Sequence, residues 1–169
     1  MWRVKMAKDK CVINVTASVL PDAIKTGIGG TTVYNVNDIG SANRWFYYRN
    51  LVDGTNQVLV PTGQVTLGDS TGDETASIGA STDAGLIIIK HTGLIEDGTK
   101  CAASAYINFN TKNGAAATTG AGGTADMRLE PGEVWWGRFC HKLLTDCTAI
   151  CNSGSVLIDV WALVDVAGV

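Results

Sequence analysis

The sequence is poor in charged residues and in proline. Lys, Arg, Asp and Glu make up 17% of its 169 residues, and 3 residues are proline, whereas soluble domains carry about 25% charged residues. The net charge is −3, and no run of Lys or Arg occurs. Because nucleic-acid affinity depends on clustered positive charge, nucleic acid is not an expected partner. A weakly charged surface suits a protein that neighbouring molecules cover.

Long apolar runs are also missing. No stretch approaches the roughly 18 apolar residues of a membrane-spanning helix, so no membrane partner is expected. The first six residues carry positive charge, but Asn14, Thr16 and Ser18 interrupt the segment that follows. A signal peptide needs an unbroken apolar region there. We therefore expect a soluble protein that is made in the cytoplasm.

The usual catalytic motifs are absent too. There is no Gly-x-Ser-x-Gly motif and no phosphate-binding glycine-rich loop before a helix. Cys140 and His141 are neighbours, which on a strand point to opposite faces. Glu130 and Glu133 flank a tight turn, where they are expected to cap the turn rather than to face a cleft as paired catalytic acids. We predict a protein that is not an enzyme and that has no catalytic or cofactor-binding residues.

Five cysteines are present, at positions 11, 101, 140, 147 and 151. Cys140, His141, Cys147 and Cys151 could complete a tetrahedral zinc site, but their spacing lacks the paired C-x2-C motifs of zinc ribbons. Buried free thiols are the favoured interpretation, and no metal ligand is assigned. A disulfide between Cys151 and either Cys140 or Cys147 is the remaining alternative.

Acidic residues gather in the segment from Gly68 to Gly85. This segment is rich in Ser, Thr, Asp and Gly, so we expect a long surface loop, with a short strand around Ala76–Ile78 as the alternative. Its acids could gather around Ca²⁺, although their order does not match an EF-hand. Solvated acids that form turns are favoured. The acids are Asp69, Asp73, Glu74 and Asp83.

Short runs of alternating apolar and polar residues dominate the rest of the chain, which is typical of half-buried strands. Residues 155–164 alternate most clearly. In Leu86–His91 the four residues before Lys90 are all apolar, as in a strand buried on both faces. We predict strands at Cys11–Ala17, Thr31–Val36, Arg44–Val52, Gln57–Val60, Gln64–Leu67, Leu86–His91, Ala103–Phe109, Val134–Phe139 and Ser155–Val164.

Turn residues connect these runs. Pro21 and Gly27–Gly30 are expected to end the first strand, and residues 61–63 to close a hairpin between Gln57–Val60 and Gln64–Leu67. Glu130–Glu133 contains Pro followed by Gly, the pattern of a type II turn. Thr111–Ala125, rich in Gly, Ala and Thr, is expected to be an exposed excursion.

No run of ten residues keeps a helical period, and residues 139–144 could form one turn at most. The fold class that we predict is therefore all-β, an antiparallel β-sandwich or jelly roll with little or no helix. A single domain is expected over residues 1–169, with an N-terminal arm at residues 1–10 and the exposed loop at residues 111–125.

The aromatic residues are the candidate binding residues. Sugars stack on exposed aromatic faces, so a carbohydrate platform is one interpretation, but in sandwiches such residues more often fill a core or an interface. Two adjacent tryptophans must face opposite sides of a strand, so one of them lies at a contact or in a second core. The interface candidates are Trp2, Trp45, Tyr47, Trp135, Trp136 and Trp161.

The second half of the chain resembles the capsid decoration or cement proteins of tailed bacteriophages, over Gly85–Val166. Four segments carry the resemblance, and the first half shows none. They are Leu86-Ile87-Ile88-Ile89-Lys90-His91-Thr92-Gly93, Tyr106-Ile107-Asn108-Phe109, Leu129-Glu130-Pro131-Gly132-Glu133, and the terminal strand after Asn152-Ser153-Gly154.

The resemblance implies a β-sandwich on the outside of a virion capsid that holds major capsid protein subunits together and has no catalytic residues. It further implies synthesis in the host cytoplasm and a homo-oligomer, with a trimer among the expected forms. Two alternatives share the fold class: a carbohydrate-binding virion or cell-surface module, and a structural subunit of the tail or of the head–tail connector.

Overall fold

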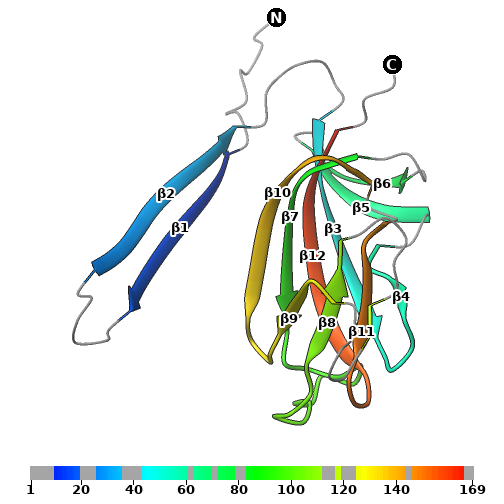
Figure 1. Cartoon of the computed structure of the whole chain (residues 1–169). Coiled ribbons are helices and arrows are strands. Elements are labelled where there is room, and N and C mark those ends of the chain that lie inside the picture. Colours follow the sequence, from blue (N-terminus) through cyan, green and yellow to red (C-terminus); the bar gives the residue numbers. More distant parts are fainter. Residues whose placement is uncertain are drawn as a thin grey trace, which may run out of the picture. The chain divides into compact units, whose positions relative to one another are not determined.

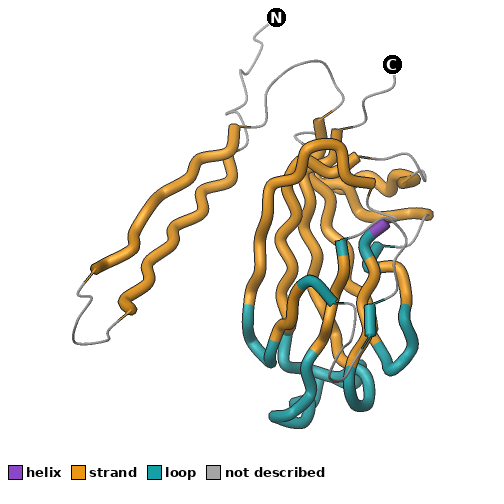
Figure 2. The backbone as a smooth tube through the Cα atoms, in the orientation of Figure 1, coloured by secondary structure: helices purple, strands orange, loops and turns teal. Residues whose placement is uncertain are grey.

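The computed structural model describes residues 10–19, 26–35, 43–60, 63–69, 72–78, 83–111, 117–118, 125–143 and 146–165. These residues form twelve strands, and their one helical element is a short turn at Asp146 (Figures 1 and 2). The predicted all-β class is confirmed. The chain separates into two compact units, residues 1–43 and 44–169. The single-domain organisation stays a prediction, and the expected arm lies outside the described residues except for Lys10.

The first unit contains one antiparallel hairpin of β1 (Lys10–Val19) and β2 (Thr26–Asn35). The strand predicted at Cys11–Ala17 is confirmed. The prediction that Gly27–Gly30 ends the first strand is wrong, because these residues belong to β2 and pair with β1 from Ser18 to Val15. A glycine keeps both backbone hydrogen-bonding groups, so it weakens a strand without preventing the ladder.

The second unit contains a six-stranded sheet with the order β10-β7-β12-β3-β5-β6. The pairs β10–β7, β7–β12, β3–β5 and β5–β6 are antiparallel. The strands are β3 (Asn43–Val52), β5 (Gly63–Asp69), β6 (Gly72–Ile78), β7 (Asp83–His91), β10 (Val134–Leu143) and β12 (Val156–Asp165).

A second sheet has four short strands in the order β4-β11-β8-β9, and its pairs are antiparallel. The strands are β4 (Gln57–Val58), β8 (Ile107–Asn110), β9 (Met127–Leu129) and β11 (Thr148–Cys151). The strand expected over Ala103–Phe109 begins only at Ile107, because residues 101–106 form a turn and an irregular segment.

The hydrophobic core lies between these two sheets, which face each other in Figure 1. In β12, Val156, Ile158, Val160 and Ala162 are fully buried, as the alternation in the sequence predicts. Ile107 and Phe109 enter the core from β8 in the opposite sheet. The ring of Phe109 meets the ring of Trp135 edge to face, with centroids 5.2 Å apart. The antiparallel sandwich is therefore built as predicted.

The turn between β9 and β10 is the type II turn that the sequence predicts. Gly132 has a φ of 88°, and the Glu133 N–H donates to the Glu130 carbonyl at 3.0 Å. A carboxylate oxygen of Glu133 accepts the N–H of Glu130 at 2.8 Å. This contact confirms that one of the two acids caps the turn.

Two predicted connections are wrong. Gln57–Val58 pairs with β11, whereas Gly63–Asp69 pairs with β3 and β6, so the expected hairpin between them is replaced by strands in different sheets. The expected loop from Gly68 to Gly85 contains β6 and the start of β7, so the alternative of a strand around Ala76–Ile78 is confirmed, and that strand begins earlier, at Gly72. Polar Thr and Ser fit a strand as long as the ladder satisfies their backbone, so composition alone misjudged this segment.

The exposed excursion predicted at Thr111–Ala125 is also wrong where the structure describes it. Ala117 is buried, and its N–H donates to Oδ1 of Asn56 at 2.7 Å and to Oγ1 of Thr148 at 3.1 Å. Residues 112–116 and 119–124 lie outside the described residues. At residues 139–143 the structure has strand β10 where one helical turn was the alternative.

Candidate functional site

Three of the predicted aromatic residues lie together on the outer face of the six-stranded sheet. Trp136 of β10 is opposite Ile88 of β7, and Ile88 is opposite Trp161 of β12. The Tyr47 ring of β3 lies 5.5 Å from the Trp161 ring, tilted by 39°. We call Trp136, Ile88, Trp161 and Tyr47 the aromatic row. All four are half-buried, so the row crosses four neighbouring strands and keeps accessible surface.

The row faces away from the core because neighbouring residues on the same strands face inward. Trp135, Ile89 and Val160 form the next cross-strand row, and all three belong to the core or pack against it. Since side chains alternate along a strand, Trp136, Ile88 and Trp161 must point to the other side. The adjacent tryptophans therefore divide as expected, with Trp135 against the core and Trp136 outside.

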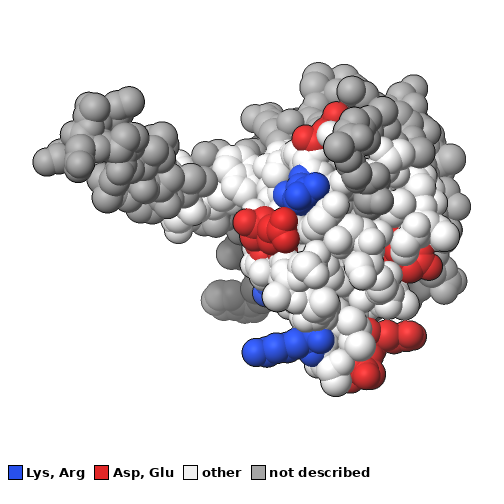
Figure 3. Space-filling model, turned by 60° about the horizontal axis from the view of Figure 1, so that its bottom comes forward, with Lys and Arg blue, Asp and Glu red and all other residues white. Residues whose placement is uncertain are grey.

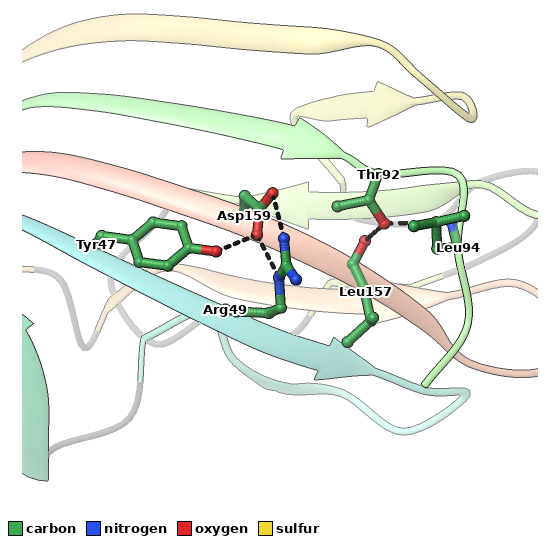
Figure 4. A network of polar contacts seen from close by, with 6 residues as sticks. All are labelled: Tyr47, Arg49, Thr92, Leu94, Leu157 and Asp159. Atoms are coloured by element: carbon green, nitrogen blue, oxygen red, sulfur yellow. Dashed lines mark hydrogen bonds and ion pairs between the residues drawn. The ribbon is translucent and has the colours of Figure 1, made fainter. Parts of the chain in front are cut away.

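Polar residues lie beside the aromatic row. Lys90 is opposite Val134 on one side and Asp159 on the other. Asp159 accepts the Tyr47 hydroxyl at 2.8 Å, and it accepts Nε and Nη2 of Arg49 at 2.7 and 3.1 Å (Figure 4). The Asp159 side chain is 9% exposed and the Arg49 side chain 51%. Arg49 thus covers the carboxylate and still presents its guanidinium group to solvent.

The charge states of this cluster are well defined. Burial raises the pKa of Asp159, but hydrogen bonds from Arg49 and Tyr47 and the nearby charges outweigh it, so this pKa lies below its ordinary value. Burial and the hydrogen bond to Asp159 raise the pKa of Tyr47. At neutral pH the carboxylate is ionised and the phenol is neutral. A carboxyl group that is ionised at neutral pH cannot serve as a general acid there.

A second polar network fixes the start of β12 to the loop that follows β7. The Thr92 hydroxyl donates to the Leu157 carbonyl at 2.7 Å and accepts the Leu94 N–H at 3.2 Å (Figure 4). The Leu157 N–H donates to the Leu94 carbonyl at 2.8 Å. These bonds hold β12, and with it Asp159 and Trp161, in register with β7.

His91, at the end of β7, is fully buried. The Gly93 N–H donates to its Nδ1 at 3.1 Å, so the neutral ring carries its proton on Nε2, which makes no hydrogen bond of normal geometry. Burial lowers the pKa of His91, and this effect outweighs the Ala105 carbonyl and the carboxylates of Glu130 and Glu133, which raise it. The ring is a neutral part of the core.

The remaining predicted interface residues are placed differently. Trp135 packs against Phe109 and is not available on the outer face. Trp45 lies in β3 opposite Gly68, and its side chain is outside the described residues. Trp2 is outside the described residues altogether. The sequence missed Ile88, Arg49, Lys90 and Asp159, although the alternation of residues 155–164 already places Asp159 on the same side of its strand as Trp161.

Of the three cysteines whose side chains are described, two are buried as predicted and Cys101 is half-buried. Cys147 and Cys151 are the buried pair, and Cys151 is free, so the alternative of a disulfide to Cys151 is wrong. The Cys151 thiol donates to the Ser153 carbonyl at 3.2 Å, and burial raises its pKa. Within the described part of the chain, no group of three or more His, Cys, Asp and Glu residues is arranged to hold a metal. The side chains of Cys11, Cys140 and His141 are outside the described residues.

The four acids considered for Ca²⁺ do not share a loop. Asp69 ends β5, opposite Gly72 of β6, and Asp73 of β6 is opposite Gly68. Glu74 follows in β6, and Asp83 begins β7. The prediction of one polar loop is therefore corrected, because the ladder spreads these acids over three strands.

No family model matches the chain, and neither does any curated protein or solved structure. No helix in the described segments is both long and apolar enough to cross a membrane.

Proposed function

We propose that this chain is a non-enzymatic virion structural protein, a decoration or cement subunit that binds the outside of a tailed-phage head and bridges major capsid protein subunits. The observation that carries the proposal is the aromatic row on the outer face of the six-stranded sheet. The resemblance of Gly85–Val166 to such proteins suggests the major capsid protein as the partner that the row binds.

The outer face has the composition of a protein-binding surface. Tryptophan, tyrosine and arginine are enriched at interface centres and contribute most of the binding free energy there. Here Tyr47, Trp136 and Trp161 are half-buried, so each can still lose accessible area to a partner. Asp159 fixes Tyr47 and Arg49 in advance, which reduces the entropy that these side chains lose on binding.

A weakly charged surface suits assembly on a symmetric particle. In the view of Figure 3, charged side chains form small separate groups on a largely uncharged surface, with no extended region of one sign. Binding then depends on apolar contact rather than on long-range attraction. Many identical weak contacts on a symmetric shell add up, so each copy needs only moderate affinity.

The test uses heads of a phage from whose genome the gene for this chain has been deleted. Purified protein is then added to these heads. We expect the parent protein to sediment with the heads and to raise their resistance to heat and osmotic shock. Trp136→Ala and Trp161→Ala should each weaken binding at least tenfold, as is typical of a central interface residue. The matched control is Tyr106→Ala, which removes a half-buried aromatic residue that stacks on Arg128 in the region of the other sheet.

Heads that neither bind the parent protein nor gain resistance would overturn the decoration function. If the parent binds but both tryptophan variants bind equally well, the outer face is not the attachment surface. A circular dichroism spectrum and a melting temperature close to those of the parent will show that each variant is folded.

One observation favours a carbohydrate-binding module as the second candidate. The rings of Tyr47 and Trp161 lie beside the exposed donors of Arg49 and Lys90, and sugars combine stacking with such hydrogen bonds. A glycan array probed with the parent and with Trp161→Ala separates the two candidates. Hits that Trp161→Ala loses would favour the carbohydrate function, and an array without hits would remove it.

A further inference from the structure

The six-stranded sheet has two open edges in the described part of the chain. β10 pairs there with β7 alone, and β6 with β5 alone. An edge strand presents a row of backbone N–H and carbonyl groups that another strand can bind. Both edges are long enough to do so, since β10 has ten residues and β6 has seven.

The two edges carry opposite charge. β10 contains Arg138 and Lys142 and no acid, whereas β6 contains Asp73 and Glu74 and no base. Like charges opposite each other destabilise a strand pair, and opposite charges stabilise it. Two β10 edges or two β6 edges therefore repel each other, while β10 and β6 attract.

The first half of β10 is well formed for pairing. Its register with β7 is regular from Val134 to Arg138 and shifts only after Arg138. Val134 is 53% exposed, the largest exposed fraction among the large hydrophobic residues of the described chain. Exposed apolar residues on an edge strand favour the addition of another strand.

We propose that β10 of one copy pairs antiparallel with β6 of a second copy, so that the sheet continues from one molecule into the next. Opposed residues in a sheet must belong to the same side. In β10, position 138 is two residues from Trp136 and therefore belongs to the side of the aromatic row. In β6, Asp73 is opposite Gly68, and Gly68 is opposite Trp45 of β3. Position 45 is two residues from Tyr47, so the position of Asp73 belongs to the same side. The register that places Asp73 opposite Arg138 meets this condition, and it places Ser77 opposite Val134.

This interface joins two different surfaces of the same chain. Such a contact closes into a ring when its rotation permits and otherwise continues as a filament. The inference goes beyond the attachment of the outer face to a capsid and does not depend on it, because the edges can pair whatever the aromatic row binds.

Charge reversal tests both the interface and its register, with sedimentation velocity of the full chain as the measurement. We expect the parent to form oligomers whose mass rises with concentration and falls at high salt. Asp73→Lys and Arg138→Glu should each weaken association about tenfold, because an attractive pair becomes a repulsive one. The double variant Asp73→Lys/Arg138→Glu should restore it. The controls Glu96→Lys and Lys100→Glu make the same charge changes in an exposed loop and should leave association unchanged.

A parent that stays monomeric over the whole concentration range would overturn the proposal. A double variant that associates as weakly as the two single variants would also overturn it. Only a register that places Asp73 opposite Arg138 predicts that the double variant regains association. Circular dichroism of each variant checks that the sandwich is folded.

Discussion

The hydroxyl of Tyr47 donates to Oδ1 of Asp159 at 2.8 Å across 112 residues of sequence. The same oxygen accepts Nε of Arg49 at 2.7 Å. This contact joins β3 to β12 at the aromatic row, and it lowers the pKa of Asp159.

Replacing Asp159 by Asn should lower the free energy of unfolding by about 1 kcal/mol at pH 7, because the substitution removes the ion pair with Arg49, whose side chain is itself half exposed. Tyr47→Phe removes one neutral donor, so it should lower the free energy of unfolding by less than Asp159→Asn does. The pKa of Asp159 is lowered on folding from an ordinary value of 3.8. Its stabilising contribution is therefore complete above that value and is lost as the pH falls through the lower folded pKa. Urea unfolding from pH 2 to pH 7 measures this, and equal acid sensitivity of Asp159→Asn and the parent would contradict it.

His91 should make the protein less stable in mild acid. Its pKa is lowered on folding from 6.5, so below pH 6.5 the unfolded chain binds a proton that the folded chain does not. The free energy of unfolding should then fall by up to about 1.4 kcal/mol per pH unit until the folded pKa is reached. His91→Leu should be less stable than the parent at pH 7.5, because the Gly93 N–H loses its acceptor. Between pH 6.5 and pH 5 its free energy of unfolding should change less with pH than that of the parent. Both proteins keep His141, so the difference between their urea-unfolding curves isolates His91, and parallel pH profiles would refute this assignment.

Gly137 should not tolerate a side chain. It is half-buried in β10, and a Cβ there would overlap Cη2 and Cζ2 of Trp135, whose ring is held against Phe109. Gly137→Ala should lower the free energy of unfolding by about 1–3 kcal/mol, the usual cost of overpacking. In a Trp135→Leu background the same substitution should cost less than half as much, and chemical denaturation of all four proteins gives the coupling energy. A coupling energy near zero would show that Trp135 is not the obstacle.

Gly132→Ala should lower the free energy of unfolding by about 1 kcal/mol, through backbone conformation alone. The φ of Gly132 is 88°, and nothing lies within 4 Å of a Cβ placed there, so the cost is that of a left-handed conformation. Gly54→Ala is the control, because the φ of Gly54 is not in that region and its nearest heavy atom to such a Cβ is 4.0 Å away. The melting temperature should fall for Gly132→Ala and stay within about 2 °C of the parent for Gly54→Ala. Equal effects of the two substitutions would argue against the turn assignment.

The sequence predicted the fold class because the signal for it is local. Alternation over residues 155–164 defines two faces of a strand from spacing alone, and Pro131 with Gly132 defines a turn from two backbone preferences. Because side chains alternate along any strand, Trp135 and Trp136 in the strand predicted at Val134–Phe139 had to point to opposite sides. Composition was a poorer guide, because residues 72–78 look like a loop and form a strand once β5 pairs with them.

Local pattern by itself therefore determined that the chain is all-β, where its turn before β10 lies, and that its tryptophans are divided between two faces. Only the tertiary structure decided which strands are neighbours. That choice brought Tyr47, Trp161 and Asp159 together and buried Ala117. The physical reason is that alternation fixes the side on which a residue lies, whereas the partner strand is selected by the packing of the whole core between the two sheets.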